Sequence, residues 1–225
     1  MSKKDEKKHD ELVNVENALT NTEVFIEKYQ KQILIGVGAI VLVVLIALSF
    51  RNFYLQPREI AAENEMYKAE SVFAKDSFRL ALNGGGADLM GFKEIVSNYG
   101  ITSSGKLAAA YAGICYYKLG QYDNAIKYLS QFDGEDTYFT TSVIGLTGDS
   151  YVELGDKSKA ISYFEKAADK DNAVLSPIYL KKAGLVYESL NQPEKADKAY
   201  AKIKDNYPKS PEAADIDKYI ARVQK

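Results

Sequence analysis

The stretch "YYKLGQYDNAIKYL", residues Tyr116–Leu129, has two related copies further along the chain. One is "YVELGDKSKAISYF", residues Tyr151–Phe164, and the other is "YESLNQPEKADKAY", residues Tyr187–Tyr200. The three copies begin at residues 116, 151 and 187, which gives a period of about 35 residues. A fixed internal period of this length is typical of proteins in which similar units stack on their neighbours. The sequence therefore predicts a stack of repeated units.

Each copy predicts two helices joined by a tight turn. In the first unit, Gly113 and Tyr116 are three residues apart and share one face of a helix. Gly120 suits the end of that helix, and Ala125, Leu129 and Phe132 place a second apolar face after the turn. The same pattern recurs in the later units as Gly148, Tyr151, Gly155, Ala160, Phe164 and Ala167, and as Gly184, Tyr187, Asn191, Ala196, Tyr200 and Ile203.

The small residues have a physical role in this pattern. A glycine on the first helix and an alanine on the second allow the two helices of a pair to approach closely, as with Gly148 and Ala160. The aromatic residues at the other positions then fill the space toward the next pair. We therefore expect helical hairpins with closely packed partners.

The Gly, Tyr, Ala, aromatic, Ala and Pro positions resemble those of the tetratricopeptide repeat. The resemblance covers roughly residues 104–210, and it is best in the middle unit. Ala109, Ile144 and Leu180 stand where the family prefers Trp, and Phe132 and Ile203 stand where it prefers Ala. The resemblance implies an all-α solenoid whose function is to bind proteins.

The repeat domain is predicted to span residues 56–225. Pro57 is suited to open a helix, which would run on helical spacing to Leu82, and Phe92 and Ile95 predict a second helix, giving a degenerate first unit. At the other end an apolar stripe predicts a helix that caps the stack. Its residues are Ala213, Ile216, Ile220 and Val223. The total is about 3.5–4 helical hairpins.

A membrane anchor is predicted before the repeats. Residues Ile33–Phe50 carry no charge, and as a helix they would span about 27 Å, close to the thickness of the hydrocarbon core of a bilayer. A cleaved signal peptide does not fit, because seven acidic residues precede the run and no small-residue cleavage pattern follows it. We therefore expect an uncleaved transmembrane helix over residues 33–55.

The first 32 residues form a charged tail. Leu12, Val15 and Leu19 are compatible with a short amphipathic helix within it. The cations close to the two ends of the apolar run do not decide its orientation, but further lysines in the tail favour a cytoplasmic N-terminus. These are Lys3, Lys4, Lys7 and Lys8. We therefore expect the tail inside the cell and the part of the chain after the anchor on the other side of the membrane.

The sequence offers no set of residues for catalysis. The only histidine, His9, lies in the tail, and the glycine-rich "NGGGAD" lacks both the preceding strand and the following lysine of a phosphate-binding loop. The single cysteine, Cys115, excludes an internal disulfide and is expected to be buried. The balance of 29 basic and 31 acidic residues gives no reason to expect a nucleic-acid partner. We expect no enzyme activity, metal, cofactor or small-molecule substrate.

The first helix of each unit has a second stripe beside the one that packs against its partner helix. It runs through Ala110 and Ile114 in the first unit and through Gly145 and Val152 in the second, and it is expected to line the concave side. The predicted protein-binding residues on this side are Tyr117, Lys118, Asp149, Glu153, Lys181 and Glu188. A second interpretation stays open, in which these residues form only the solvated face of a spacer.

A lysine-bearing tail, one anchor and a small repeat domain together are similar to the YfgM type of bacterial inner-membrane protein, an ancillary subunit of the Sec translocon. That resemblance implies a location in the bacterial inner membrane, with the repeat domain in the periplasm. It also implies partners among translocon subunits, periplasmic chaperones and secreted polypeptides. Two other classes stay open. One is a structural scaffold for another envelope assembly machine. The other is a cytoplasm-facing chaperone adaptor, which would need a cluster of Lys and Arg in its groove.

Overall fold

The computed structural model describes residues 28–86 and 88–225. Within them, two units meet at Gln56 and Pro57. The predicted amphipathic helix, His9 and the tail lysines that favour a cytoplasmic N-terminus lie outside the described residues. The described elements are all helical apart from one isolated bridge between Gly85 and Leu89, which confirms the predicted all-α class.

The apolar stretch lies within a helix that runs over Lys28–Phe73. Its residues 33–50 are all exposed in the described chain, including Ile33 and Phe50 at the two ends of the predicted anchor. This is the one helix among residues 28–86 and 88–225 that is long and apolar enough to cross a membrane.

The helix does not begin at Pro57, contrary to the sequence prediction. A π-helical segment η1 (Arg51–Leu55) leads directly into α2 (Gln56–Phe73), and the Gln56 N–H donates to the carbonyl of Arg51. Proline has no N–H, and its ring clashes with the carbonyl four residues earlier in a regular α-helix. The wider π-helical turn relieves that clash, so the helix passes through Pro57.

The expected helix to Leu82 is also interrupted. α2 ends at Phe73, and α3 (Phe78–Asn83) begins after a turn in which Asp76 has a φ of 56°. The turn brings the rings of Phe73 and Phe78 to 5.4 Å in an edge-to-face contact. It also lets Leu82 reach the core, where only 2% of its surface is exposed. The gain in burial explains why the turn forms within a sequence that has helical spacing.

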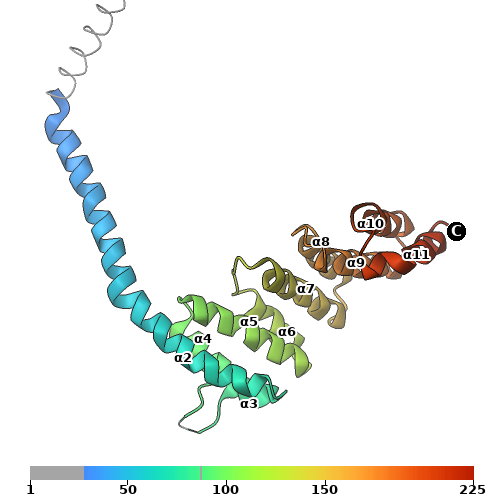
Figure 1. Cartoon of the computed structure of the whole chain (residues 1–225), viewed down its shortest axis with the longest axis horizontal. Helices are drawn as coiled ribbons and strands as arrows, with labels where there is room; N and C mark the ends of the chain where they lie inside the picture. The colour runs from blue at the N-terminus through green and yellow to red at the C-terminus, as the bar shows by residue number, and fades with distance from the viewer. Residues whose placement is uncertain (1–27, 87) are drawn as a thin grey trace, which may run out of the picture. The chain divides into compact units, whose positions relative to one another are not determined.

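The rest of the chain forms paired helices that follow one another along the repeat unit (Figure 1). A short α4 (Phe92–Tyr99) precedes three full pairs. These pairs are α5 (Ser103–Lys118) with α6 (Tyr122–Leu129), α7 (Thr137–Glu153) with α8 (Lys157–Ala168), and α9 (Leu175–Ser189) with α10 (Pro193–Asn206).

The turn inside each pair has the same geometry. Gly120, Gly155 and Asn191 have φ values of 72°, 78° and 56°, so all three adopt the left-handed conformation that ends a helix. The residue after each turn donates its N–H to the carbonyl of Tyr116, Tyr151 or Tyr187, at 2.9, 2.9 and 3.0 Å. The sequence prediction of these turns is confirmed, including asparagine in place of glycine.

The predicted close approach within each pair is also confirmed. A Cβ added at Gly113 would lie 2.5 Å from the side chain of Leu129, and one added at Gly148 would lie 2.7 Å from the ring of Phe164. At Gly184 it would meet the ring of Tyr200. The alanines opposite have no exposed surface; they are Ala125, Ala160 and Ala196.

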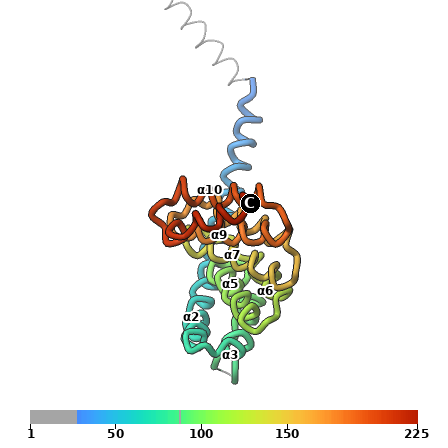
Figure 2. Tube along the Cα trace, turned by 90° about the vertical axis from the view of Figure 1, so that its right-hand side faces the viewer, coloured from blue at the N-terminus to red at the C-terminus, as the bar shows by residue number. Residues whose placement is uncertain are grey.

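The pairs form two layers. The first helices α5, α7 and α9 contact one another in succession, and the second helices α6, α8 and α10 lie on the other side. Figure 2 looks along this stack from its C-terminal end. A 3-10 turn η2 (Pro211–Asp215) then leads into α11 (Ile216–Val223), whose Ile216 is 1% exposed. The stack therefore ends in the predicted capping helix.

Candidate functional site

Tyr117 on α5 lies near Asp149 and Glu153 on α7, so three of the predicted binding residues come together. The ring of Tyr117 lies 5.5 Å from that of Tyr122 in an edge-to-face contact. Burial raises the pKa of the Tyr117 hydroxyl, and the nearby carboxylates of Asp149 and Glu153 raise it further. The hydroxyl therefore stays protonated at neutral pH and remains a hydrogen-bond donor beside two carboxylates.

Lys118 lies apart from this group. Its ammonium is 6.0 Å from the centre of the Phe78 ring, so the side chain extends toward α3 and away from α7. One residue of difference along a helix turns the side chain by about 100°, which explains why neighbours in sequence face different elements. The structure does not place Lys118 with the other predicted residues.

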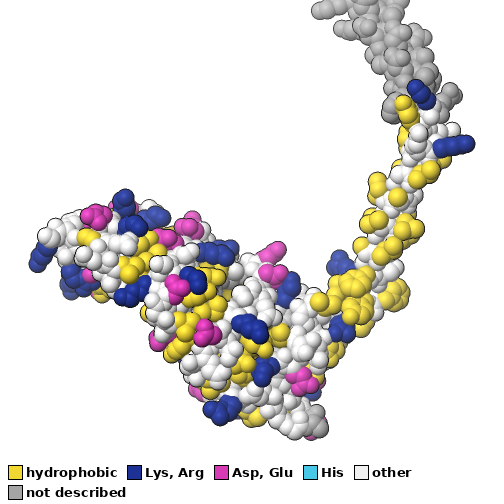
Figure 3. Space-filling model, turned by 180° about the vertical axis from the view of Figure 1, so that it is seen from behind, with side chains coloured by type: hydrophobic (Ala, Val, Ile, Leu, Met, Phe, Trp, Pro, Cys, Tyr) yellow, Lys and Arg dark blue, Asp and Glu magenta, His cyan; other side chains and the backbone are white. Residues whose placement is uncertain are grey.

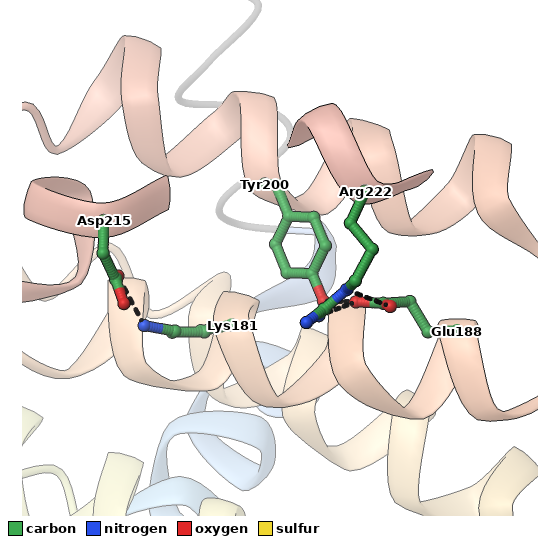
Figure 4. Close-up of polar contacts among 5 residues, drawn as sticks. All are labelled: Lys181, Glu188, Tyr200, Asp215 and Arg222. Atoms are coloured by element: carbon green, nitrogen blue, oxygen red, sulfur yellow. Dashed lines mark hydrogen bonds and ion pairs between the residues drawn. The ribbon is translucent and has the colours of Figure 1, made fainter. Parts of the chain in front are cut away.

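Lys181 and Glu188 are engaged by the C-terminal segment (Figure 4). The ammonium of Lys181 lies 2.8 Å from a carboxylate oxygen of Asp215. Arg222 donates two hydrogen bonds to the carboxylate of Glu188, at 2.6 and 2.8 Å, and the hydroxyl of Tyr200 donates a third. Their role in binding a partner stays a prediction, and their described contacts are within the chain.

An apolar hollow lies beside Asp149 on the layer of first helices. Its volume is about 270 Å³. It is lined by Ile114, Phe139, Ser142, Val143, Leu146, Asp149 and Tyr179, which come from α5, α7 and α9. Three consecutive repeats therefore contribute to one concave site, with apolar walls and few polar groups.

Two residues of the predicted stripe do not face this hollow. Ala110 has no exposed surface, and the space beside Gly145 is filled by the ring of Tyr179 from the next repeat. The expectation that these two positions are free was wrong, because the repeat period does not show how far a neighbouring aromatic side chain reaches. The α7 wall of the hollow is formed by a neighbouring stripe of that helix, in which Leu146 precedes Asp149 by three residues.

Lys182 was missed by sequence analysis. Its ammonium donates to both carboxylate oxygens of Asp149, each at 2.7 Å, and lies 5.6 Å from the centre of the Tyr179 ring. The pair links α7 to α9 and offsets the charge of Asp149. Glu153 has no ion pair within residues 28–86 and 88–225, and its carboxylate accepts a hydrogen bond from the hydroxyl of Tyr122.

The described part of the chain shows no group of three or more His, Cys, Asp or Glu side chains placed to hold a metal. Cys115 is buried, as predicted, and burial raises the pKa of its thiol to about 12. It is therefore a packing residue that stays protonated at neutral pH. On the face drawn in Figure 3, basic and acidic side chains are interspersed with hydrophobic ones. A mixed surface of this kind is suited to a polypeptide partner.

Comparison with known proteins agrees with this architecture. Models of the tetratricopeptide repeat match residues 111–133, 144–172 and 182–210. No curated protein matches the sequence. A crystal structure of MamA protein is 20% identical, with a TM-score of 0.56 over 72% of this chain and 80% of that one. A kinesin light chain-type protein of Podosopora anserina with nearly identical TPR-like repeats is 12% identical, with a TM-score of 0.51 over 72% and 84%. The three matched segments are tetratricopeptide repeats.

Proposed function

We propose that this chain is a single-pass, membrane-anchored protein that binds polypeptides at the bacterial envelope, as an accessory to the Sec translocon or the periplasmic chaperone network. Tetratricopeptide repeats mediate interactions between proteins and generally act as scaffolds without catalytic activity. The binding surface in this proposal is the layer of first helices. Translocon subunits, periplasmic chaperones and secreted polypeptides are the proposed partners.

The hollow between α5, α7 and α9 is the observation that carries the proposal. It combines apolar walls with the nearby hydroxyl of Tyr117 and the carboxylate of Glu153, which has no ion pair in the described chain and accepts a hydrogen bond from Tyr122. An apolar side chain of a partner would enter the hollow, and polar groups along the partner backbone or a basic side chain would meet the rim. Such a site accepts many sequences, which suits a protein that meets newly translocated chains.

The exposed apolar helix supports the membrane part of the proposal. Residues 33–50 have no protein partner in the described chain, and their transfer into a bilayer removes a large apolar surface from water. We propose residues 33–55 as the anchor, residues 1–32 as a cytoplasmic tail and residues 56–225 as the periplasmic repeat domain.

The lysines of the layer of first helices bear on the reversed topology. A cytoplasm-facing adaptor would use free cations to hold a terminal carboxylate. In the described chain, Lys181 and Lys182 are paired with Asp215 and Asp149, and Lys118 lies over Phe78. These contacts favour the periplasmic alternative. A structural scaffold for another assembly machine would differ from a translocon or chaperone accessory in the partner that it binds. Identifying the bound partner therefore distinguishes these two alternatives.

Purification of the tagged full chain from solubilised membranes tests the proposal. The wild type is compared with a Tyr117→Ala, Glu153→Lys variant, and bound proteins are identified by mass spectrometry. We expect translocon subunits, chaperones or many secreted chains with the wild type, and a loss of about tenfold or more in the variant. Tyr163→Ala is the matched control, because it removes a partly buried tyrosine from α8 in the other layer.

Two results would contradict the proposal. A single stoichiometric partner from a different envelope machine would make the chain a scaffold. Recovery that is unchanged in the variant would place binding on another face. A topology reporter fused after Lys225 tests the orientation separately, and a cytoplasmic signal would overturn the periplasmic location.

A further inference from the structure

A second concave surface lies on the opposite layer, between α8 and α10. The first helix of the third repeat, α9, forms its floor. This trough has a volume of about 280 Å³ and adjoins a second hollow of about 200 Å³ toward the end of α10. The two hollows share Ala168, Asp169, Leu180 and Lys202, so they form one continuous trough. No residue of the trough lines the hollow between α5, α7 and α9.

The trough is open because one aromatic side chain is replaced by alanine. In the middle repeat, the ring of Tyr163 on α8 packs 5.3 Å from that of Tyr151 on α7. The corresponding positions in the third repeat hold Ala199 and Tyr187. Ala199 leaves the space above Tyr187 unfilled, and both residues line the trough. Its floor therefore consists of small and apolar side chains, among them Ala183 and Leu180.

One wall of the trough carries positive charge. Lys195, Lys198 and Lys202 are spaced three and four residues apart, so they share one face of α10, and all three are exposed. Lys195 lies 5.5 Å from the centre of the Tyr187 ring. In the described chain, neither Lys198 nor Lys202 has a hydrogen bond or an ion pair. The position of Lys198 is occupied by Ser162 in the middle repeat, where the trough is filled.

The opposite wall carries negative charge. Glu165 lies on α8 and accepts a hydrogen bond of 2.7 Å from the hydroxyl of Tyr187, and Asp169 follows the end of the same helix. The two walls therefore have opposite signs across an apolar floor. An occupant that matches both needs an apolar stripe with acidic side chains along one edge and basic side chains along the other.

The walls and the floor are formed mainly by the helices α8, α9 and α10, and this selects the backbone of the occupant. Their N–H and C=O groups are already paired within the helices, so an extended peptide would find no backbone partners in the trough. A helix brings its own hydrogen bonds and needs only side-chain contacts. Residues 195–206 of α10 span about 17 Å, which corresponds to about three turns of a bound helix.

We propose that the trough between α8 and α10 docks an amphipathic helix of a partner protein, with the acidic edge of that helix against Lys195, Lys198 and Lys202. The third repeat thus offers a second interaction surface that is separate from the hollow between α5, α7 and α9. An anchored chain with two such surfaces can hold a helical partner on one layer while the other layer contacts a different polypeptide.

Fluorescence anisotropy of the full chain in detergent micelles tests this proposal. The probe is a labelled helical peptide of about 14 residues, with a leucine stripe, glutamates along one edge and lysines along the other. We expect saturable binding to the wild type, and a loss of about tenfold or more in both Ala199→Tyr and Lys198→Glu, Lys202→Glu. Ala199→Tyr restores the tyrosine found in the middle repeat, and circular dichroism checks its fold.

The controls separate this surface from the proposed function. A peptide with lysines along both edges is expected to bind at least about tenfold more weakly. The Tyr117→Ala, Glu153→Lys variant is expected to bind the probe as the wild type does, even if its polypeptide partners are lost. Equal binding by Ala199→Tyr and the wild type would overturn the proposal, as would no binding to the wild type. Self-association that Ala199→Tyr abolishes would identify the occupant as a second copy and would also overturn it.

Discussion

The second and third matched repeats, residues 144–172 and 182–210, share their interior and differ on both outer surfaces. Inside, Gly148 packs on Phe164 in the same way as Gly184 packs on Tyr200. Outside, the space above Tyr151 is filled by Tyr163, whereas the space above Tyr187 is open. The repeat pattern therefore determines the contacts within a pair, and single departures from it create the surfaces between pairs.

The polar contacts of the two repeats also differ. Asp149 of the second repeat pairs with Lys182, which belongs to the following repeat. Glu188 of the third repeat pairs with Arg222 on the capping helix α11, which packs against this repeat. A side chain at the end of the stack is thus paired with the cap, while one in the middle is paired with its neighbour.

The largest expected effect is at the shared interior position. Phe164→Ala and Tyr200→Ala each remove a ring that is at most 1% exposed and leave a cavity between two helices. We expect each change to lower the free energy of unfolding by about 3–5 kcal/mol. Chemical denaturation of the full chain, followed by circular dichroism, measures it. A loss below about 1 kcal/mol at either site would show that the two repeats do not share a packed interior.

A smaller effect is expected from the glycines that face these rings. In Gly148→Ala, the new Cβ lies 2.7 Å from the ring of Phe164, and in Gly184→Ala it meets the ring of Tyr200. Overpacking of this kind costs about 1–3 kcal/mol, measurable by the same denaturation experiment. Gly38→Ala is the control, and no loss of stability is expected from it, because the new Cβ has no atom within 4 Å. Stabilisation by Gly148→Ala or Gly184→Ala would contradict the close approach.

The contact with the capping helix has a pH dependence. Burial alone would raise the pKa of Glu188, but hydrogen bonds from Arg222 and Tyr200 and the charge of Arg222 hold it below its ordinary value of 4.5. The stabilisation is therefore present above about pH 4.5 and is lost as the pH falls through the lowered value.

Arg222→Ala tests this contact in the third repeat. The variant is expected to be less stable than the wild type at pH 7, and the difference is expected to shrink as the pH falls below 4.5. Urea denaturation at pH 7 and at acidic pH measures it. A difference that stays constant over this range would show that the Glu188–Arg222 pair does not contribute to stability.

The smallest expected effect is at Glu153 in the second repeat. This carboxylate is exposed and has no cationic partner in the described chain, so Glu153→Gln is expected to change the free energy of unfolding by less than about 0.5 kcal/mol. Thermal or chemical denaturation checks this. A loss comparable to that of Arg222→Ala would show that Glu153 has a structural role and would weaken its assignment to a binding rim.

The sequence was sufficient for the paired helices because their signals are local. The spacing of Gly148, Tyr151 and Phe164, and the turn at Gly155, predict the hairpin within one repeat. The passage of the helix through Pro57 depends on a π-helical segment. The turn near Asp76 depends on the packing of α3 against α5. Neither feature has a local signal in the sequence.

The candidate site was predicted only in part for the same reason. Tyr117 and Asp149 were found because each lies on the same stripe of its own first helix, and Glu153 was found because it lies beside that stripe. The pairing of Lys182 with Asp149 joins neighbouring repeats and requires their relative position. The engagement of Lys181 and Glu188 by the cap requires the path of the chain after Pro208, which helical spacing alone does not give.

Site-specific photocrosslinking in growing cells tests the central claim most directly. A photoreactive amino acid replaces Tyr117 on the layer of first helices or Tyr163 on the layer of second helices, each in the full chain. The account predicts adducts to translocon subunits, chaperones or many secreted chains from position 117, and few or none from position 163. Adducts from position 163 alone would contradict it, because the layer of first helices would then contact none of these chains.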